Sequence, residues 1–287
     1  AHSGRRYLST QACSGSLQRW VMARWPGKQW ALETRVSKEF NEEVLLAEVH
    51  DAFGRVRVVE MGEYRFLEFG DAVEQSCVFS ADPAWLEYDY TRGMLLGALL
   101  HESAETALFL GLGAGNLTQC CLKVLALDDV EVIELRPDVP RLAMQFLGLT
   151  DDPRLTIRIG DAMTLLATAE TADLIFLDLY TDTGPAAGHL AWKFLEDCQH
   201  KLNPGGWLVI NQWGTDGGKP LGAALLRGLF HRHYWEIPVK EGNVILLIPA
   251  SLEQQLDTQA VTARCEELAP RLGYSLQSLL DAIRPAS

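Results

Sequence analysis

The chain has 287 residues and a formal net charge of −13, with 48% hydrophobic and 22% charged residues. This length allows one large α/β domain with a small appendage, and the composition is that of an ordinary globular protein. The acidic balance argues against a nucleic-acid partner and suits either a cationic substrate or simple solubility. We expect no membrane segment and no secretory signal, because no apolar run is long enough to cross a bilayer and the N-terminus lacks an apolar core with a cleavage site.

The cysteine pattern indicates a reducing compartment. None of the six cysteines forms a CxxC pair, and their spacing is irregular. A disulfide framework or a cysteine zinc site would show regular spacing. We therefore expect reduced, mostly buried thiols in a cytoplasmic protein that carries no metal. The positions are Cys13, Cys77, Cys120, Cys121, Cys198 and Cys265.

The N-terminal part falls into two stretches. Residues 1–43 show no clean period, and we treat them as an extension without an assigned function. Residues 44–80 contain short β-rich segments separated by glycine-containing turns, which predicts a small antiparallel β-domain of three or four strands. A sheet this small needs a cover for its face, supplied by either the main domain or a second subunit. The second alternative predicts a homodimer.

Residues 81–250 form the predicted main domain. A helix over residues 85–100 leads into a regular alternation of strands and helices, which predicts a doubly wound, mostly parallel, Rossmann-like α/β sheet. An antiparallel pair completes the sheet, and residues 251–287 carry helical periodicity. The expected strands cover residues 107–110, 130–134, 155–159, 172–178, 207–211, 234–239 and 244–249, and the expected helices cover residues 117–125, 137–147, 191–202 and 221–230.

The chain is organised around residues 107–116, which read ALFLGLGAGN. A short apolar strand ends in three alternating glycines, Gly111, Gly113 and Gly115, and a helical pattern follows. Such a turn brings backbone N–H groups and a helix N-terminus up to a ligand, whose approach a Cβ would block. The spacing is similar to the first motif of class I S-adenosylmethionine enzymes. The alternative is a strand-to-helix turn that simply needs glycines, and ligand binding is favoured over it.

Three acids follow strands at the edge where open α/β sheets bind ligands. Glu134 ends the second strand, where a carboxylate typically accepts both hydroxyl protons of a ribose, or else it caps the next helix. Asp161 either contacts a ligand or is a helix N-cap, and the two alternatives are balanced. Asp178 closes a fully apolar strand, where an acid is more often functional than structural.

The order of five segments resembles the spermidine synthase (polyamine aminopropyltransferase) family. These segments are GLGAG, IELRP, DDPRLTIRIGDA, LIFLDLYTDTGP and LNPGGWLVIN. The upstream β-rich stretch ending Glu74-Gln75-Ser76 is similar to the N-terminal domain of that family. The resemblance implies transfer of an aminopropyl group from decarboxylated S-adenosylmethionine to a putrescine-like amine, with release of methylthioadenosine.

The resemblance also implies roles for individual residues. Asp178 would be catalytic and would hold and deprotonate the attacking amine. The chemistry agrees, because a nearby carboxylate can both anchor an ammonium ion and accept its proton. The residues implied in binding decarboxylated or intact S-adenosylmethionine are Gln75, Gly111, Gly113, Gly115, Glu134, Asp161 and Ala162.

Several positions depart from the pattern of this family. Ala114 stands where the family's loop carries an acid, and Thr91-Arg92-Gly93 stands where its helix carries Tyr-His-Glu. A dication needs about two anionic anchors to leave water. Ala114 somewhat favours the alternative of a methyltransferase that uses intact S-adenosylmethionine, and a non-catalytic nucleoside-binding protein is a third alternative. The candidates for the acceptor pocket are Tyr180, Asp182 and Asp89, with Glu87 as a further acid.

Overall fold

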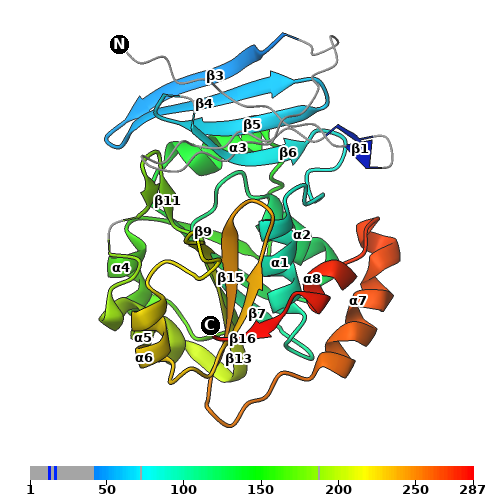
Figure 1. Cartoon of the computed structure of the whole chain (residues 1–287). Helices are drawn as coiled ribbons and strands as arrows, with labels where there is room; N and C mark the ends of the chain where they lie inside the picture. Colours follow the sequence, from blue (N-terminus) through cyan, green and yellow to red (C-terminus); the bar gives the residue numbers. More distant parts are fainter. Residues whose placement is uncertain (1–11, 14–15, 18–41, 72, 187) are drawn as a thin grey trace.

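The computed structural model describes residues 12–13, 16–17, 42–71, 73–186 and 188–287. A four-stranded antiparallel sheet lies above a larger, eight-stranded sheet, and helices cover both faces of the larger sheet (Figure 1). Most of the predicted N-terminal extension lies outside the described residues. Two short strands within it, β1 (Ala12–Cys13) and β2 (Ser16–Leu17), pair with each other.

The small sheet confirms the predicted antiparallel meander and has four strands. Each strand pairs with the next in the chain, in the order β3-β4-β5-β6. One face carries Val56, Val58, Leu67 and Phe69, which belong to the same apolar core as the main domain. The main domain therefore covers this face. The strands are β3 (Val44–Asp51), β4 (Gly54–Met61), β5 (Tyr64–Phe69) and β6 (Val73–Phe79).

The large sheet confirms the predicted doubly wound α/β fold. Its order is β16-β14-β15-β13-β10-β7-β8-β9, and β13, β10, β7, β8 and β9 are parallel. The antiparallel pair predicted at the end of the domain is β14 and β15, and β15 also pairs with β13. The strands are β7 (Thr106–Leu110), β8 (Asp129–Glu134), β9 (Leu155–Ile159), β10 (Ala172–Leu177), β13 (Leu202–Trp213), β14 (Trp235–Pro238), β15 (Asn243–Pro249) and β16 (Arg284–Pro285).

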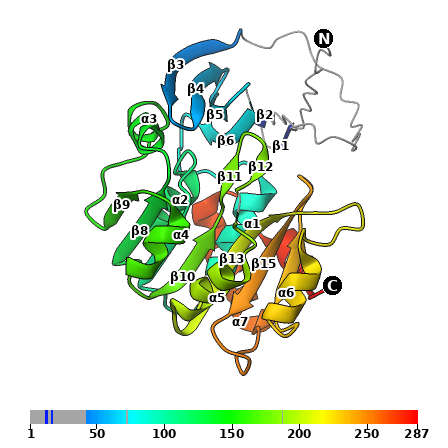
Figure 2. The same ribbon diagram turned by 90° about the vertical axis from the view of Figure 1, so that its left-hand side faces the viewer.

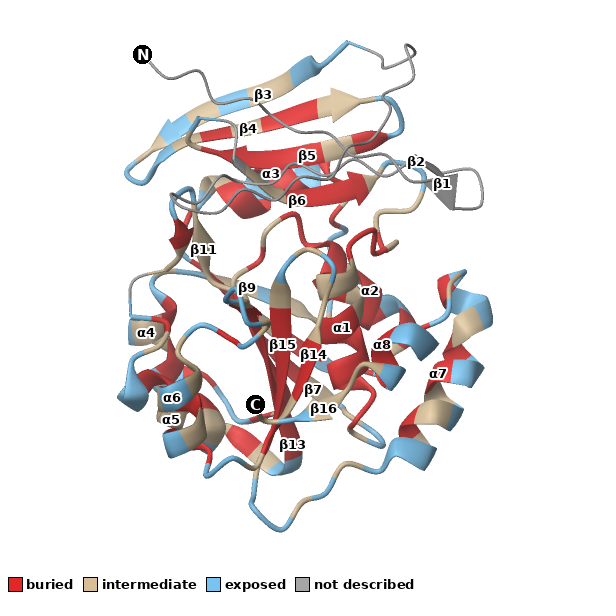
Figure 3. Ribbon diagram, in the orientation of Figure 1, coloured by how far each residue is buried: buried red, intermediate tan, exposed pale blue. Residues whose placement is uncertain are grey.

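Helices cover the two faces of the large sheet and leave its strand ends open toward the small sheet (Figure 2). Each face has its own apolar core, because every central strand is apolar on both sides. Burial is highest in the central strands, while the outer faces of the helices are exposed (Figure 3). One face carries α1 (Asp89–Ala98), α2 (Asn116–Val124), α3 (Asp138–Phe146), α7 (Thr258–Leu272) and α8 (Gln277–Asp281), and the other carries α4 (Ala162–Leu165), α5 (Trp192–His200) and α6 (Ala223–Leu229).

Three predicted elements differ from the structure. The helix expected from residue 85 begins at Asp89, because the preceding segment is extended and inserts Leu86 into the core. The strand expected from residue 207 begins at Leu202, where a register shift against β10 lets the strand start early. The C-terminal stretch also contains β16, which is short enough to show no period and is held by an ion pair from Arg284 to Glu236 at 3.0 Å.

Two further expectations concern whole-chain properties. The described residues include no helix that is both long and apolar enough to span a bilayer. The cysteines whose side chains are described are all buried and form no disulfide with one another, as expected of reduced thiols. They are Cys77, Cys120, Cys121, Cys198 and Cys265.

Candidate active site

The glycine turn has the backbone conformation that its sequence predicts. Gly111, Gly113 and Gly115 have φ values of +98°, +57° and +80°, which L side chains rarely adopt. A Cβ at Gly111 would also lie 2.3 Å from the carbonyl oxygen of Asp178. The turn is therefore held close to the end of β10, and Gly115 is the left-handed N-cap residue of α2.

The last strand of the small sheet docks on this turn. Ser76 Oγ accepts a hydrogen bond from the Ala114 N–H at 3.1 Å, and Asn116 Nδ2 donates to the Cys77 carbonyl at 3.2 Å. Gln75, predicted to lie near the cofactor, is the residue next to Ser76, at a register shift between β5 and β6. Ser76 itself was not predicted, because nothing in the sequence shows that its hydroxyl reaches the turn.

Glu134 lies at the end of β8 with its carboxylate bound to the same turn. The residue is 7% exposed, Oε2 accepts from the Leu112 N–H at 3.0 Å, and Oε1 accepts from the Arg136 N–H at 2.9 Å. Burial raises the pKa of this carboxyl above its usual range, and the two N–H donors act against the rise. Both bonds go to residues before α3, so Glu134 does not cap that helix.

Arg136 connects this corner to the small sheet. Its guanidinium donates two hydrogen bonds of 2.8 Å to the Asp51 carboxylate and one of 2.8 Å to the Gly54 carbonyl. It also lies 4.4 Å from the centre of the Phe69 ring. This bidentate pair fixes the β3–β4 hairpin beside Glu134. No local pattern predicts the pair, because 85 residues separate the partners.

Asp161 and Ala162 lie at the start of α4, next to the end of β9. Asp161 is the N-cap of α4 and accepts from the Met163 N–H at 3.0 Å. The structure thus bears out the capping alternative, and a contact with adenine stays a prediction. Ala162 is buried in the core beneath it.

Asp178 follows β10 and faces a small cavity beside the glycine turn. Its Oδ1 accepts from Asn211 Nδ2 at 2.8 Å. Burial raises the pKa of Asp178 to about 6, and the Asn211 bond acts against the rise. A carboxylate with this pKa is ionised at neutral pH and can still exchange a proton there. It has the properties of a general base.

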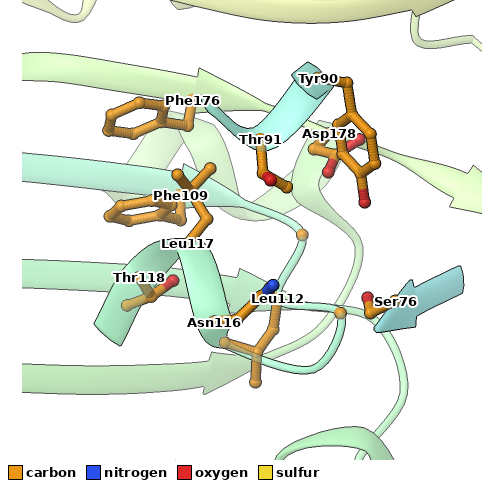
Figure 4. A pocket seen from close by; sticks show the side chains of 12 residues that line it. Ser76, Tyr90, Thr91, Phe109, Leu112, Asn116, Leu117, Thr118, Phe176 and Asp178 are labelled. Atoms are coloured by element: carbon orange, nitrogen blue, oxygen red, sulfur yellow. The ribbon is translucent and has the colours of Figure 1, made fainter. Parts of the chain in front are cut away.

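The cavity lies between Asp178 and the turn (Figure 4). Its volume is about 20 Å³, which is room for about one water molecule. Tyr90 and Thr91 from α1 form one wall, and Ser76 enters from β6. Burial raises the pKa of the Tyr90 hydroxyl well above its usual range, and the charges of Asp178, Glu74 and Glu241 add to the rise. Tyr90 therefore stays a neutral hydroxyl surrounded by carboxylates.

Glu241 is a functional candidate that the sequence did not indicate. It lies in the turn between β14 and β15, where Oε1 accepts from the Asp89 N–H at 2.7 Å. Its Oε2 is shielded from solvent, and no group among the described residues donates to it. Burial, together with the charge of Asp89, raises the pKa of Glu241 to about 7. An unpaired buried carboxylate oxygen of this kind is costly unless a cation approaches it.

The predicted acceptor residues occupy different surroundings. Tyr180 in β11 (Tyr180–Thr181), which pairs with β12 (Gly184–Pro185), donates its hydroxyl proton to the Asn211 carbonyl at 3.1 Å, close to Asp178. Asp182 is exposed and packs against Gly70 of the small sheet. Asp89 is paired with Lys240 at 3.0 Å and with Arg92 at 3.6 Å. Glu87 is buried and accepts hydrogen bonds from Tyr64 and Trp85.

The fold and the glycine turn define the class of protein, a Rossmann-like α/β fold of the class I methyltransferase type. Solved structures of this kind align over most of the chain. A spermidine synthase in complex with the transition-state analogue AdoDATO aligns with a TM-score of 0.61 and 14% identity, covering 83% of each chain. A probable spermidine synthase from Corynebacterium glutamicum aligns with a TM-score of 0.63 and 20% identity, covering 76% of this chain and 86% of that one.

Sequence comparison finds relatives within this fold class. Residues 93–215 match the family model described as the spermine/spermidine synthase domain. The polyamine aminopropyltransferase of Nitrosomonas europaea is 29% identical over 193 residues, which are 64% of this chain and 57% of that protein. The polyamine aminopropyltransferase of Pseudomonas syringae is 29% identical over 160 residues, 51% of this chain and 56% of that protein. The match thus spans little more than half the length of these relatives, and residues 93–215 are similar to the spermine/spermidine synthase domain.

Proposed function

We propose that this protein is an aminopropyltransferase that moves an aminopropyl group from decarboxylated S-adenosylmethionine to an amine and releases methylthioadenosine. The observation that carries the proposal is the position of Asp178, a carboxylate with a pKa of about 6 beside the glycine turn. The family match over residues 93–215 supports the same reaction. A nucleoside-binding protein without catalysis has no need of a base at this point.

The nucleoside would lie across the ends of the parallel strands. Gly111, Gly113 and Gly115 leave the turn open to close approach, since a Cβ at each position would add bulk and strain. Glu134 would accept the ribose hydroxyl protons with the lone pairs that its two N–H donors leave free. Asp161 and Ala162 would contact the adenine, and Gln75 would approach from β6.

The residues of this chain would support a direct displacement. The unprotonated acceptor nitrogen attacks the methylene carbon next to the sulfonium, a C–N bond forms, and the C–S bond breaks to leave a neutral thioether. The amine loses one proton, which Asp178 can accept. Such positioned proton transfer contributes about 10²–10⁴-fold to rate. An alkylamine is protonated at neutral pH, so a base is needed to release its lone pair.

The anionic surroundings of Tyr90 favour a diamine as acceptor. Asp178 and Glu241 both act on its hydroxyl, and Glu241 has a buried oxygen without a donor among the described residues. These two carboxylates would supply the two anchors that a dication needs. Tyr180 would line the same pocket, whereas Asp182 and Asp89 would lie at its rim.

Binding and turnover measurements test this function. Calorimetry with methylthioadenosine, decarboxylated S-adenosylmethionine and intact S-adenosylmethionine identifies the preferred nucleoside. An acceptor screen with putrescine, cadaverine and spermidine then follows product formation. We expect turnover of at least one amine with the decarboxylated compound. Methyl transfer from intact S-adenosylmethionine would contradict the proposal and support the methyltransferase alternative. Nucleoside binding without any turnover would support the non-catalytic alternative.

Glu134→Ala should weaken methylthioadenosine binding by about 1–3 kcal/mol, because ribose hydroxyl groups lose their acceptor. Calorimetry measures the change, and Glu134→Gln, which keeps the shape of the side chain, should show a smaller loss. Glu170→Ala, at an exposed acid, serves as the control. A folded Glu134→Ala variant with wild-type affinity would contradict this placement of the ribose.

We expect a homodimer in a cytoplasmic setting. The main domain covers one face of the small sheet, but β3 is an edge strand with Val44 and Leu45 about half exposed. Pairing of such an edge with a second copy would remove it from solvent. Sedimentation at micromolar concentration should show a species of twice the 31.9 kDa chain mass. A monomer alone would contradict the dimer without affecting the proposed reaction.

A further inference from the structure

Behind Asp178 lies a chain of hydrogen bonds through three further side chains. Asn211 lies near the C-terminal end of β13, is 5% exposed, and donates through its Nδ2 to Asp178 Oδ1 at 2.8 Å. Asn243 begins β15 and donates its Nδ2 to Asn211 Oδ1 at 2.7 Å. Tyr180 donates its hydroxyl proton to the backbone carbonyl of Asn211 at 3.1 Å.

This chain has a single direction, which the ionised carboxylate of Asp178 sets because it can only accept hydrogen bonds. The backbone carbonyl of Asn211 can only accept, so Tyr180 must donate to it. On the side-chain amide of Asn211, Oδ1 accepts from the NH₂ group of Asn243 at 2.7 Å. With its oxygen occupied, the Asn211 amide can present only its NH₂ group to Asp178. The amide therefore cannot flip to place an oxygen against the carboxylate.

We infer that Asn243 is a positioning residue for Asp178: acting through Asn211, it holds a fixed donor on Oδ1 and leaves Oδ2 to receive the proton of the acceptor amine. The catalytic part of this inference rests on the proposed aminopropyl transfer. The positioning part concerns only the carboxylate and its donor, so it can be tested without turnover.

Other titratable side chains around Asp178 lie on α1, β11, β6 and the β14–β15 turn. Tyr90 on α1 and Tyr180 on β11 have hydroxyls whose pKa values burial raises well above the usual range, so both stay neutral. The charges of Glu241 in the β14–β15 turn and of Glu74 in β6 both act on Tyr90. Neutral substitutions in the asparagine pair leave all of these charges unchanged, so a change in Asp178 titration reports the lost donor.

The test follows the carboxyl carbon of Asp178 by ¹³C NMR across pH, with Asp178→Asn to identify its signal. Asn211→Ala removes the hydrogen-bond donor to Asp178 and should raise the titration midpoint of Asp178 by about one to two pH units. This is the range for a hydrogen bond to a charged group. Asn243→Ala should raise the midpoint by up to about one unit, because the Asn211 amide is then free to flip. If Asn211→Ala does not fold, Asn211→Ser fills more of the space and takes its place.

The double variant separates a relay from a general loosening of the site. Because Asn243 acts through Asn211, Asn243→Ala should cause no additional shift in the Asn211→Ala background. The matched control is Asn203→Ala, since Asn203 donates to Asp173 at 2.9 Å at the opposite ends of β13 and β10. It should leave the Asp178 midpoint unchanged.

Two results would overturn the inference. One is an unchanged titration midpoint of Asp178 in a folded Asn243→Ala variant. The other is that Asn243→Ala shifts this midpoint equally in the wild-type and the Asn211→Ala backgrounds. Failure of the proposed function looks different, because the midpoint would still shift while no amine is converted by the wild-type protein. Where turnover is found, kcat of Asn243→Ala should fall several-fold, while the affinity for methylthioadenosine stays the same. The pH at which the rate falls on the acid side should shift together with the NMR midpoint of Asp178.

Discussion

Replacing Asp178 by asparagine should lower turnover by about 10²–10⁴-fold, the contribution of a positioned general base. Asparagine keeps the shape of the side chain and removes the group that accepts the proton. Methylthioadenosine carries no amine to be deprotonated, so its affinity should change little. Steady-state rates with the best acceptor amine, together with calorimetry, measure both quantities. A wild-type rate in the Asn variant would assign Asp178 a structural role only.

The dependence of the wild-type rate on pH provides a second check on the same residue. The pKa of Asp178 is raised to about 6 by burial. The ionised form accepts the proton, so kcat/KM should fall as pH decreases through about 6 and should level off above it. Asp178→Asn should lose this limb and keep only the dependence that comes from the amine and from Glu241, whose pKa burial raises to about 7. An acid limb that persists unchanged in the variant would point to a different base.

Gly111→Ala should abolish detectable nucleoside binding or weaken it by at least about tenfold. Its φ of +98° is strained for alanine, and the new Cβ would lie 2.3 Å from the Asp178 carbonyl oxygen. A left-handed conformation alone costs a non-glycine residue about 1–2 kcal/mol. The contact would also force the glycine turn away from β10, so the turn and Asp178 would move apart. Calorimetry with methylthioadenosine measures the loss.

Gly205 offers a matched control for this substitution. Its φ of +83° carries similar strain, but a Cβ there would meet nothing within 4 Å. Gly205→Ala should therefore lower stability and leave nucleoside affinity unchanged. Thermal unfolding of both variants separates the strain from the contact. Equal affinity of Gly111→Ala and wild type would show that the turn does not hold the nucleoside.

The sequence predicted those parts of the fold and site that local pattern encodes. Residues 107–116 combine an apolar strand, alternating glycines and a helix start, and each level of the pattern indicates the same unit. Glu134 and Asp178 were found because they end apolar strands, whose carboxyl ends share one edge of a parallel sheet. In contrast, β16 has only two residues and no pattern to detect.

The residues that sequence analysis missed come together only in three dimensions. Glu241 lies in a hairpin turn, where an acid is usually a solvated surface residue, yet the hairpin packs it against the start of α1. Asn211 and Asn243 lie on neighbouring antiparallel strands, so their contact depends on the register between β13 and β15. Ser76 reaches the glycine turn from a separate sheet. None of these contacts has a signature in local spacing.

The Arg136 pair with Asp51 limits how freely the two parts of this protein could be recombined. Arg136 follows the strand end that carries Glu134, while Asp51 belongs to a hairpin of the small sheet. A chimaera that brought in the small sheet of a relative without an acid at this hairpin would leave a buried guanidinium unpaired, at a cost of several kcal/mol. The small sheet is thus not an interchangeable module, and its hairpin and the β8 corner must be transplanted together.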